Sequence, residues 1–221
     1  MGEGLTPRPS ADGLRHRLFA WWYPKAAAAT DRLGFAEYRR EALAGLAGEV
    51  VEIGPGHGPN FAFYPAQVTR IVAVEPEPRM RELAAVASRA ASVPVEVVPG
   101  RAEQIPVGDS AFDAAVVTLV LCSVPDQVAA LREIRRVLRP GGRLHFLEHV
   151  RAAGGPAAAL QSALDTSRIW PLVGGGCHCS RDTAAAIEQA GFTLERCERF
   201  AFPETRLPRP TGSHILGTAV A

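Results

Sequence analysis

Cysteine is scarce in this sequence, and its spacing argues against a disulfide framework and against the common zinc folds. The 221 residues include four cysteines, and none of them belongs to a C-x-x-C pair. Cys177, His178 and Cys179 are consecutive, but adjacent side chains on an extended segment point in opposite directions. A metal ion shared by these three residues would need several further ligands from elsewhere. We therefore predict that the protein has no metal site.

A strong net charge and long hydrophobic runs are also absent. The 24 basic and 23 acidic side chains leave a formal charge of +1, and lysine and arginine form no run, so a nucleic-acid partner is not expected. No stretch approaches the roughly 18 apolar residues that span a membrane. Residues 1–13 are polar and rich in proline and glycine, which predicts a flexible tail and no signal peptide. We expect a cytoplasmic protein without an integral membrane segment.

The most informative segment that is present is a strand that runs into a loop of alternating glycines. Residues 50–53 form the largely apolar stretch typical of a covered parallel strand. Gly54, Gly56 and Gly58 follow, and glycine permits backbone angles and close ligand approaches that a Cβ atom would block. The spacing is G-x-G-x-G with Glu52 two positions ahead, whereas dinucleotide-binding folds carry G-x-G-x-x-G. Such a strand and loop place a ligand at the carboxyl edge of an α/β sheet.

Two carboxylates near this edge indicate which ligand the loop binds. Glu52 is placed to meet the ammonium group of an amino-acid ligand, and it would repel a pyrophosphate. Residues 71–75 form a second apolar strand that ends in Glu75, where nucleotide-binding α/β folds place a carboxylate for the ribose hydroxyls. The alternative is that Glu75 is a solvated side chain at a strand end. Together the two acids indicate S-adenosylmethionine, which carries an amino acid, a sulfonium and an adenosine but no phosphate.

Further strands and helices alternate up to residue 150. We predict a helix over 79–89, a third strand over 95–98, a fourth strand over 112–119, a helix over 127–138 and a fifth strand over 143–150. An acid or amide in the segment 101–106, after the third strand, is placed to bind the adenine amino group. Ala102 or Ile105 would then lie against the adenine ring.

Several motifs along the chain resemble those of a known family. E-I-G-P-G-H-G-x-N, V-E-P, A-E-Q-I-P, D-x-x-F-D and L-R-E-I-R-R-V-L-R-P-G-G occur in order, and the set resembles the class I S-adenosylmethionine-dependent methyltransferases. More narrowly, N-F-A-F-Y-P, T-L-V-L-C-S-V, F-L-E-H-V and G-G-C-H-x-x-R-D resemble the branch that contains membrane-associated thiol S-methyltransferases. The amino-terminal anchor of those enzymes has no counterpart in this sequence, so membrane residence is not expected here.

The resemblance implies a fold and a set of cofactor-binding positions. It implies a Rossmann-like α/β fold whose seven-stranded sheet has the order 3-2-1-4-5-7-6, with strand 7 antiparallel and helices on both faces. Residues 192–200 and 212–221 would supply the last two strands. The residues expected to bind the cofactor lie in the motifs or at the ends of the predicted strands: Glu52, Gly54, Pro55, Gly56, Gly58, Asn60, Glu75, Pro76, Arg101, Ala102, Glu103, Thr118 and Leu119.

Residues 14–221 are expected to form a single methyltransferase domain in which two segments enclose the methyl acceptor. Residues 14–45 are predicted to form a helical cap, whose aromatic side chains either cover the cofactor as a lid or pack as ordinary core. Residues 151–180 leave the carboxyl edge of the fifth strand and are expected to wall the acceptor pocket. We predict helices over 157–170 and 182–190, with Ser180 as the N-cap of the second.

The need for a catalytic base depends on the acceptor. Methyl transfer is an in-line displacement, so the protein mainly aligns the acceptor and excludes water. A thiol with a pKa of about 8–9 already has a thiolate fraction near neutral pH, whereas a phenol or a carbon acceptor would need a base. His149, at the end of the fifth strand, and His178, in the predicted pocket wall, are the candidate bases, with Glu148 behind them. Each is alternatively a structural histidine bonded to backbone.

These residues bear on three hypotheses for the function. The first is methylation of a small molecule, with a thiol sulfur as the leading acceptor and O- or C-methylation of a phenol or quinol-type ring as the second. A noncatalytic cofactor-binding scaffold would be expected to have lost Glu52, the glycines or Glu75, and all of these are present. A nicotinamide oxidoreductase is opposed by the glycine spacing and by Glu52. The sequence specifies neither the acceptor nor the oligomeric state.

Overall fold

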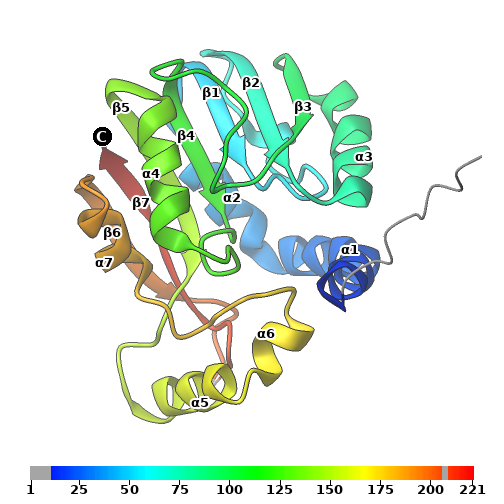
Figure 1. Cartoon of the computed structure of the whole chain (residues 1–221), viewed down its shortest axis with the longest axis vertical. Coiled ribbons are helices and arrows are strands. Elements are labelled where there is room, and N and C mark those ends of the chain that lie inside the picture. The colour runs from blue at the N-terminus through cyan, green and yellow to red at the C-terminus, as the bar shows by residue number, and fades with distance from the viewer. Residues whose placement is uncertain (1–10, 206–208) are drawn as a thin grey trace, which may run out of the picture.

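The structure, a computed structural model, describes residues 11–205 and 209–221, with the backbone alone for residues 11–18. Figure 1 shows one sheet with helices packed against it. The strands are β1 (Gly48–Ile53), β2 (Val68–Glu75), β3 (Val95–Pro99), β4 (Phe112–Thr118), β5 (Leu138–His149), β6 (Thr193–Ala201) and β7 (Ser213–Val220). The α-helices are α1 (Ala11–Thr30), α2 (Ala36–Ala42), α3 (Pro78–Ala87), α4 (Gln127–Val137), α5 (Gly155–Thr166), α6 (Ile169–Val173) and α7 (Thr183–Gln189). Short turns of other helix types cover Asp31–Phe35, Phe61–Phe63 and Ser88–Ala90.

The sheet has the predicted strand order, β3-β2-β1-β4-β5-β7-β6. Val51 of β1 pairs in parallel with Val72 of β2 on one side and with Ala115 of β4 on the other. β7 runs antiparallel to both β5 and β6, so the prediction for the last strand is confirmed. The order of the strands reverses between β1 and β4, and ligands of open α/β sheets bind in the crevice at the carboxyl ends of the strands at that point.

Helices cover both faces of the sheet, as predicted. One core contains Val51 and Ile53 of β1 together with buried side chains of α4 and α7. The core on the other face contains Val50 of β1, Ala84 of α3 and the segment after α2. Because successive strand residues point to opposite faces, residues 50–53 are buried from both sides, which explains their nearly continuous apolar character. No helix in the described ranges combines the length and the apolar character needed to cross a membrane.

Some predicted boundaries are wrong for local reasons. The predicted tail over residues 1–13 lies mostly outside the described residues, but α1 already begins at Ala11. The predicted helix over 157–170 is two helices, because Arg168 adopts a left-handed conformation with φ +59° between α5 and α6. Asp182, and not Ser180, is the N-cap of α7, since its side chain accepts a hydrogen bond from the backbone N–H of Ala185. The fifth strand begins at Leu138, directly after α4, and not at residue 143 as predicted.

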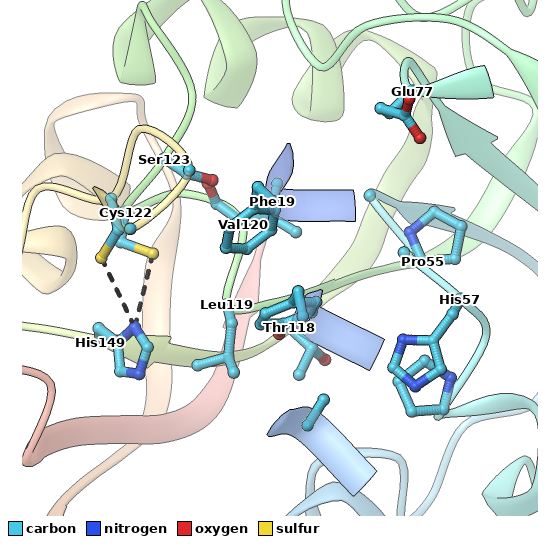
Figure 2. Close-up of a pocket in the computed structure, with 18 of the residues that line it drawn as sticks. Phe19, Pro55, His57, Glu77, Thr118, Leu119, Val120, Cys122, Ser123 and His149 are labelled. Atoms are coloured by element: carbon cyan, nitrogen blue, oxygen red, sulfur yellow. Dashed lines mark hydrogen bonds between the residues drawn. The ribbon is translucent and has the colours of Figure 1, made fainter. Parts of the chain in front are cut away.

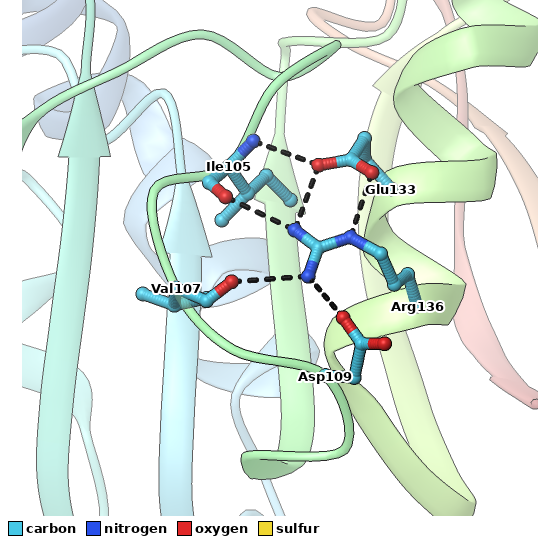
Figure 3. Close-up of polar contacts among 5 residues, drawn as sticks. All are labelled: Ile105, Val107, Asp109, Glu133 and Arg136. Atoms are coloured by element: carbon cyan, nitrogen blue, oxygen red, sulfur yellow. Dashed lines mark hydrogen bonds and ion pairs between the residues drawn. The ribbon is translucent and has the colours of Figure 1, made fainter.

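An arginine of α4 holds the loop that connects β3 to β4 (Figure 3). The Arg136 guanidinium donates to the backbone carbonyl oxygens of Ile105 and Val107, each at 3.0 Å. It also pairs with the carboxylates of Glu133, at 2.8 Å, and Asp109, at 2.6 Å. Glu133 in turn accepts a hydrogen bond from the backbone N–H of Ile105 at 3.0 Å. This network fixes the end of the segment 101–106, predicted to bind the adenine, and the residues that follow it.

Replacing Arg136 with Met is expected to lower the free energy of unfolding by about 1–2 kcal/mol, because two backbone carbonyls lose a charged donor that is only partly exposed. Chemical denaturation measures this loss. Arg132→Met is the matched control, since Arg132 is an exposed residue of the same helix. Equal losses in the two variants would show that the loop does not depend on the Arg136 contacts.

Candidate cofactor and acceptor site

A cavity of about 1410 Å³ opens at the carboxyl ends of the central strands. Every predicted cofactor-binding residue except Gly58 lines it. Figure 2 shows Pro55 and His57 of the glycine loop on one side of this cavity, with Cys122 and His149 on the other. Leu119 and Thr118, from the end of β4, lie between them. The volume exceeds the roughly 300–1000 Å³ of a drug-sized ligand site, so it has room for a cofactor and a second small molecule.

Two of the loop glycines are required for different reasons. Gly54 has φ +62°, and a Cβ atom there would lie 2.7 Å from a methyl group of Val120, at the wall of the cavity. Gly58 has φ +84°, and a Cβ atom there would meet the Phe61 ring at 2.7 Å and Ala87 at 2.9 Å. Gly58 therefore permits close packing within the fold, and the prediction that it contacts the cofactor is not supported.

The Glu52 carboxylate lines the cavity but already has protein partners. Asn60 donates to Oε1 at 2.8 Å and the Tyr64 hydroxyl donates to Oε2 at 2.8 Å. Burial raises the pKa of Glu52 to about 7, although these two hydrogen bonds and Arg39 act to lower it. Glu52 therefore anchors the glycine loop through Asn60. Contact of Glu52 with a ligand ammonium stays a prediction.

Arg39 and Tyr64 belong to the same buried network and were not found from the sequence. Arg39 of α2 donates to the Asn60 side-chain oxygen at 3.1 Å and pairs with Asp31 at 2.9 Å. Asn60 also donates to the Thr118 hydroxyl at 3.0 Å, which joins the loop to the end of β4. Tyr64 lies in the N-F-A-F-Y-P motif, so the sequence holds a signal for it. The contact of Arg39 depends on how α2 packs.

Glu75 connects the end of β2 to the glycine loop. Its Oε2 accepts a hydrogen bond from the Gly56 backbone N–H at 2.9 Å, and its Oε1 accepts one from the Glu77 N–H at 3.0 Å. Burial raises the pKa of this carboxyl to about 7 against the effect of those two hydrogen bonds. Glu75 lines the cavity beside Pro76, as expected for a residue that binds a ribose. The solvated alternative is wrong, since Glu75 is only 5% exposed.

The segment after β3 contributes some of the residues predicted to surround the adenine. Arg101, Ala102 and Glu103 line the cavity. Ile105 does not line it; its side chain is buried in the core that also contains β4 and α4. Of the two residues considered for the ring face, Ala102 is therefore the one in position.

Aromatic side chains of α1 form part of the cavity wall. Phe19 stacks on Tyr23 with ring centres 4.5 Å apart, and Tyr23 meets the His57 ring edge-on at 6.3 Å. Phe19 also touches the segment after α6, because a Cβ atom on Gly175 would lie 2.6 Å from its ring. Trp21 remains 64% exposed although it borders the cavity. The cap and the insertion therefore meet over the site, which favours the lid over the ordinary core.

The opposite end of the cavity brings together three residues that are distant in the chain. The sulfurs of Cys122 and Cys177 lie 3.7 Å and 3.8 Å from Nδ1 of His149 (Figure 2, dashed lines). Hydrogen bonds from Cys122 and then His149 lower the pKa of Cys177 to about 5, against burial. His178 does not line the cavity, and its backbone N–H donates to the Cys122 carbonyl oxygen at 2.7 Å. The placement of His178 in the pocket wall is therefore wrong, and Cys177 takes that position.

Glu148 holds the turn that carries Cys122. It is completely buried, and its carboxylate accepts hydrogen bonds from the backbone N–H groups of Val120, Leu121 and Cys122 at 2.8, 3.0 and 3.3 Å. Burial raises the pKa of Glu148 to about 7, against the effect of the hydrogen bonds. The residue lies behind His149 as predicted, but its contacts are with the β4 turn.

Comparison with known proteins identifies the family. Residues 51–146 match the family described as "Methyltransferase domain". The chain is 38% identical over 183 residues to the thiol S-methyltransferase TMT1B of Mus musculus, a match that covers 80% of this chain and 73% of that protein. It is 36% identical over 185 residues to TMT1A of Homo sapiens, with the same coverage. The chain belongs to this methyltransferase family.

Solved structures of low sequence identity share the fold of this methyltransferase. A SAM-dependent methyltransferase from Thermotoga maritima has a TM-score of 0.65 at 21% identity, covering 92% of this chain and 98% of that one. The cyclase SpnF has a TM-score of 0.69 at 20% identity, covering 99% and 98%. A cyclase on the same fold illustrates that the reaction has to be argued from the site.

The methyltransferase uses S-adenosylmethionine as its cofactor, and the cavity fits this molecule. Gly54 leaves room for close approach at a wall that a Cβ atom would fill. His57 has a buried Nδ1 atom without a hydrogen-bond partner beside the same loop, which a polar ligand atom would satisfy. Glu75 offers a carboxylate to a ribose, and Ala102 an apolar surface to a ring. These residues would hold the cofactor, which supplies the methyl group.

Cofactor binding is expected to release protons and to weaken below pH 7. The Glu75 pKa of about 7 in the free protein falls when ribose hydroxyls donate to the ionised carboxylate. Affinity is therefore fully present above about pH 7 and decreases as the pH falls through that value. Calorimetry in two buffers with different ionisation enthalpies measures the released protons. Glu75→Gln should abolish the part of the release that Glu75 contributes, and an unchanged release would assign it to another group.

Proposed function

We propose that this methyltransferase transfers the methyl group of S-adenosylmethionine to the sulfur of a small thiol. The similarity to thiol S-methyltransferases carries this proposal, because it extends over 80% of the chain and therefore well beyond residues 51–146. The residues around α6, which lie outside that core domain, line the cavity together with the aromatic side chains of α1. A match over 80% of the chain includes the residues around α6, so it bears on the acceptor as well as on the cofactor.

Methylation of a quinol-type ring has a narrower basis. Demethylmenaquinone methyltransferase of Mycobacterium tuberculosis is 50% identical, but over only 54 residues, or 24% of this chain. So short a match does not cover both the cap and the insertion, because residues 46–150 separate them. Of the two bases predicted from the sequence, His149 lines the cavity and His178 does not. We therefore favour sulfur over oxygen or carbon as the acceptor atom.

The chemical work of the protein is alignment and exclusion of water. The bound cofactor supplies an activated methyl group. Thr118 and Leu119, at the end of β4, separate the glycine loop from the His149 end of the cavity, so an acceptor at that end would face the cofactor across them. The aromatic side chains of α1 and the residues after α6 cover part of the cavity and would exclude water from the reaction. A thiolate needs no base at the moment of transfer, and residence of the enzyme in the cytoplasm stays a prediction.

The proposal is tested by incubating the protein with isotope-labelled S-adenosylmethionine and a mixed panel of small thiols, catechols and quinols. We expect mass spectrometry to show labelled thioethers. Labelled ethers or ring-methylated products, with the thiols unreacted, would establish the alternative acceptor and return His149 to the role of base. Binding of the cofactor without any transfer across the panel would favour a scaffold.

A further inference from the structure

We propose that Cys122, Cys177 and His149 bind a single zinc ion, and that its open fourth position receives the sulfur of the acceptor. The role of the fourth position rests on the proposed function, whereas the metal site stands on its own geometry. It departs from the prediction of no metal site, which considered only the consecutive residues 177–179. The three ligands come from three separate parts of the fold, which the sequence does not place together.

The distances fit a tetrahedral zinc ion. Zinc binds cysteine sulfur at about 2.3 Å and histidine nitrogen at about 2.0–2.1 Å, so the ligand atoms of a tetrahedral site lie about 3.5–3.8 Å apart. In the structure Nδ1 of His149 lies 3.7 Å from one sulfur and 3.8 Å from the other, and the three atoms lie within 4.8 Å of one another. The ligand atoms therefore need little movement to bind zinc.

Hydrogen bonds alone explain the contacts between His149 and the two cysteines less completely than a bound zinc ion does. Nδ1 of histidine has one position for a hydrogen bond, as a donor or as an acceptor, so it cannot satisfy two thiols equally. A cation between the three atoms is bound by all of them. Two thiolates also neutralise Zn²⁺, which matters because Cys122 and Cys177 are buried, with 1% and 6% of their surfaces exposed.

Backbone contacts hold the three ligands in place. The Cys122 N–H donates to Glu148, and the Cys122 carbonyl oxygen accepts from the His178 N–H, which ties the segment of Cys177 to the turn after β4. The Arg181 guanidinium donates to the Leu121 carbonyl oxygen at 2.6 Å and strengthens the same connection. His149 is the last residue of β5. A site built on held backbone has its geometry before the metal arrives.

The other two cysteines are excluded from the cluster. Cys179 is completely buried, and its sulfur lies 3.5 Å from the Asp165 carboxylate and 3.8 Å from the Gln161 carbonyl oxygen. Cys197 is exposed on β6. Among the described residues, the group Cys122, His149 and Cys177 is the one that brings three metal-ligand atoms together. These two cysteines therefore provide controls within the same chain.

Three protein ligands and an open position characterise catalytic zinc sites, as opposed to closed structural ones. A thiol that binds at this position loses its proton to solvent, since zinc-bound thiols are deprotonated. Its sulfur lone pair then forms the new bond to the methyl carbon, while the bond between that carbon and the sulfonium sulfur breaks and leaves its electron pair on the cofactor. The neutral thioether is a poorer zinc ligand than the thiolate and leaves. Zinc changes no oxidation state in these steps.

Metal binding is tested by removing metals from the purified protein and titrating it with Zn²⁺ and, separately, with Co²⁺ as a spectroscopic probe. We expect one zinc ion per chain, and Co²⁺ spectra with thiolate charge-transfer bands and the visible bands of a tetrahedral site. Cys122→Ser and Cys177→Ser should each weaken zinc binding by more than the roughly 10–100-fold that loss of an outer-shell partner costs. Cys197→Ser should bind zinc like the wild type. Cofactor affinity of each variant reports whether the fold is intact.

The outcomes separate the metal site from its role. Absence of stoichiometric zinc from the folded wild type, or equal zinc binding by all the variants, overturns the site. A mass change that reports a Cys122–Cys177 disulfide in place of metal binding overturns it in favour of a redox pair. If zinc binds and no thiol is methylated, the proposed function fails and the metal site stands. If metal-free protein methylates thiols at the full rate, the proposed function stands and the role of the metal fails.

Discussion

Replacing Glu75 with Ala is expected to weaken S-adenosylmethionine binding by on the order of a hundredfold or more. The carboxylate lines the cavity at the end of β2, where we expect it to accept hydrogen bonds from both ribose hydroxyls. Hydrogen bonds to a charged group contribute about 1.5–3 kcal/mol each, and two of them amount to about 3 kcal/mol or more. The variant also leaves the N–H groups of Gly56 and Glu77 without their acceptor, which loosens the glycine loop.

Calorimetric titration with S-adenosylmethionine and with S-adenosylhomocysteine measures this loss. Both ligands carry the ribose, so both should weaken to the same extent. Glu96→Ala is the control, since Glu96 is an acid of the neighbouring strand β3 in an exposed pair with Arg70. Wild-type affinity in Glu75→Ala would show that the ribose is bound elsewhere. An equal loss in Glu96→Ala would point to a general effect of charge.

Replacing Glu148 with Ala is expected to reduce the free energy of unfolding by about 3 kcal/mol or more. Three backbone N–H groups of the turn after β4 lose their acceptor in a region without access to water, and each unsatisfied donor costs about 1–3 kcal/mol. Glu148→Gln keeps the side-chain shape and one acceptor oxygen, but its amide N–H group faces the N–H groups of the turn. We therefore expect it to lose less unfolding free energy than the Ala variant. Urea denaturation of the three proteins gives the comparison.

The pH dependence identifies the carboxyl group as the cause. Burial raises the pKa of Glu148 from an ordinary 4.5 to about 7 in the folded protein. The folded state then holds the proton more tightly than the unfolded state, so this residue contributes less to stability as the pH rises from about 4.5 to about 7. Glu148→Gln should remove that component of the slope, and Glu198→Gln, at an exposed position of β6, should keep it. Identical slopes in the two variants would contradict the assignment.

The contacts of Glu75 and Glu148 could be predicted from the sequence only in part. Glu75 is predictable because the end of the second strand has a fixed position in this fold. Its partner Gly56 belongs to the glycine loop, which the sequence also shows. For Glu148 the sequence indicates only its position next to His149. Its three partners lie in the turn after β4, and the parallel pairing of β4 with β5 brings them to Glu148.

The two candidate bases, His149 and His178, show the same difference. His149 ends β5, and a strand end at the carboxyl edge of the sheet faces the site in any register that the apolar pattern allows. His178 lies in an irregular segment, where no periodicity says which residue points inward. The structure turns Cys177 into the cavity, and the peptide of His178 binds the Cys122 carbonyl.

The sequence by itself determined the sheet, its order through the resemblance, the glycine loop and the acid at the end of β2. These features are local, since apolar runs, glycine spacing and strand ends are read from neighbouring residues. Only the tertiary structure decided that Glu52 binds Asn60 and Tyr64, that the α1 aromatics meet the insertion, and that Cys122, His149 and Cys177 form one cluster. The contacts of α1 and of the cysteine cluster join segments far apart in the chain, while those of Glu52 cross the irregular loop after β1. The geometry of all of them follows from how helices and loops pack on the sheet.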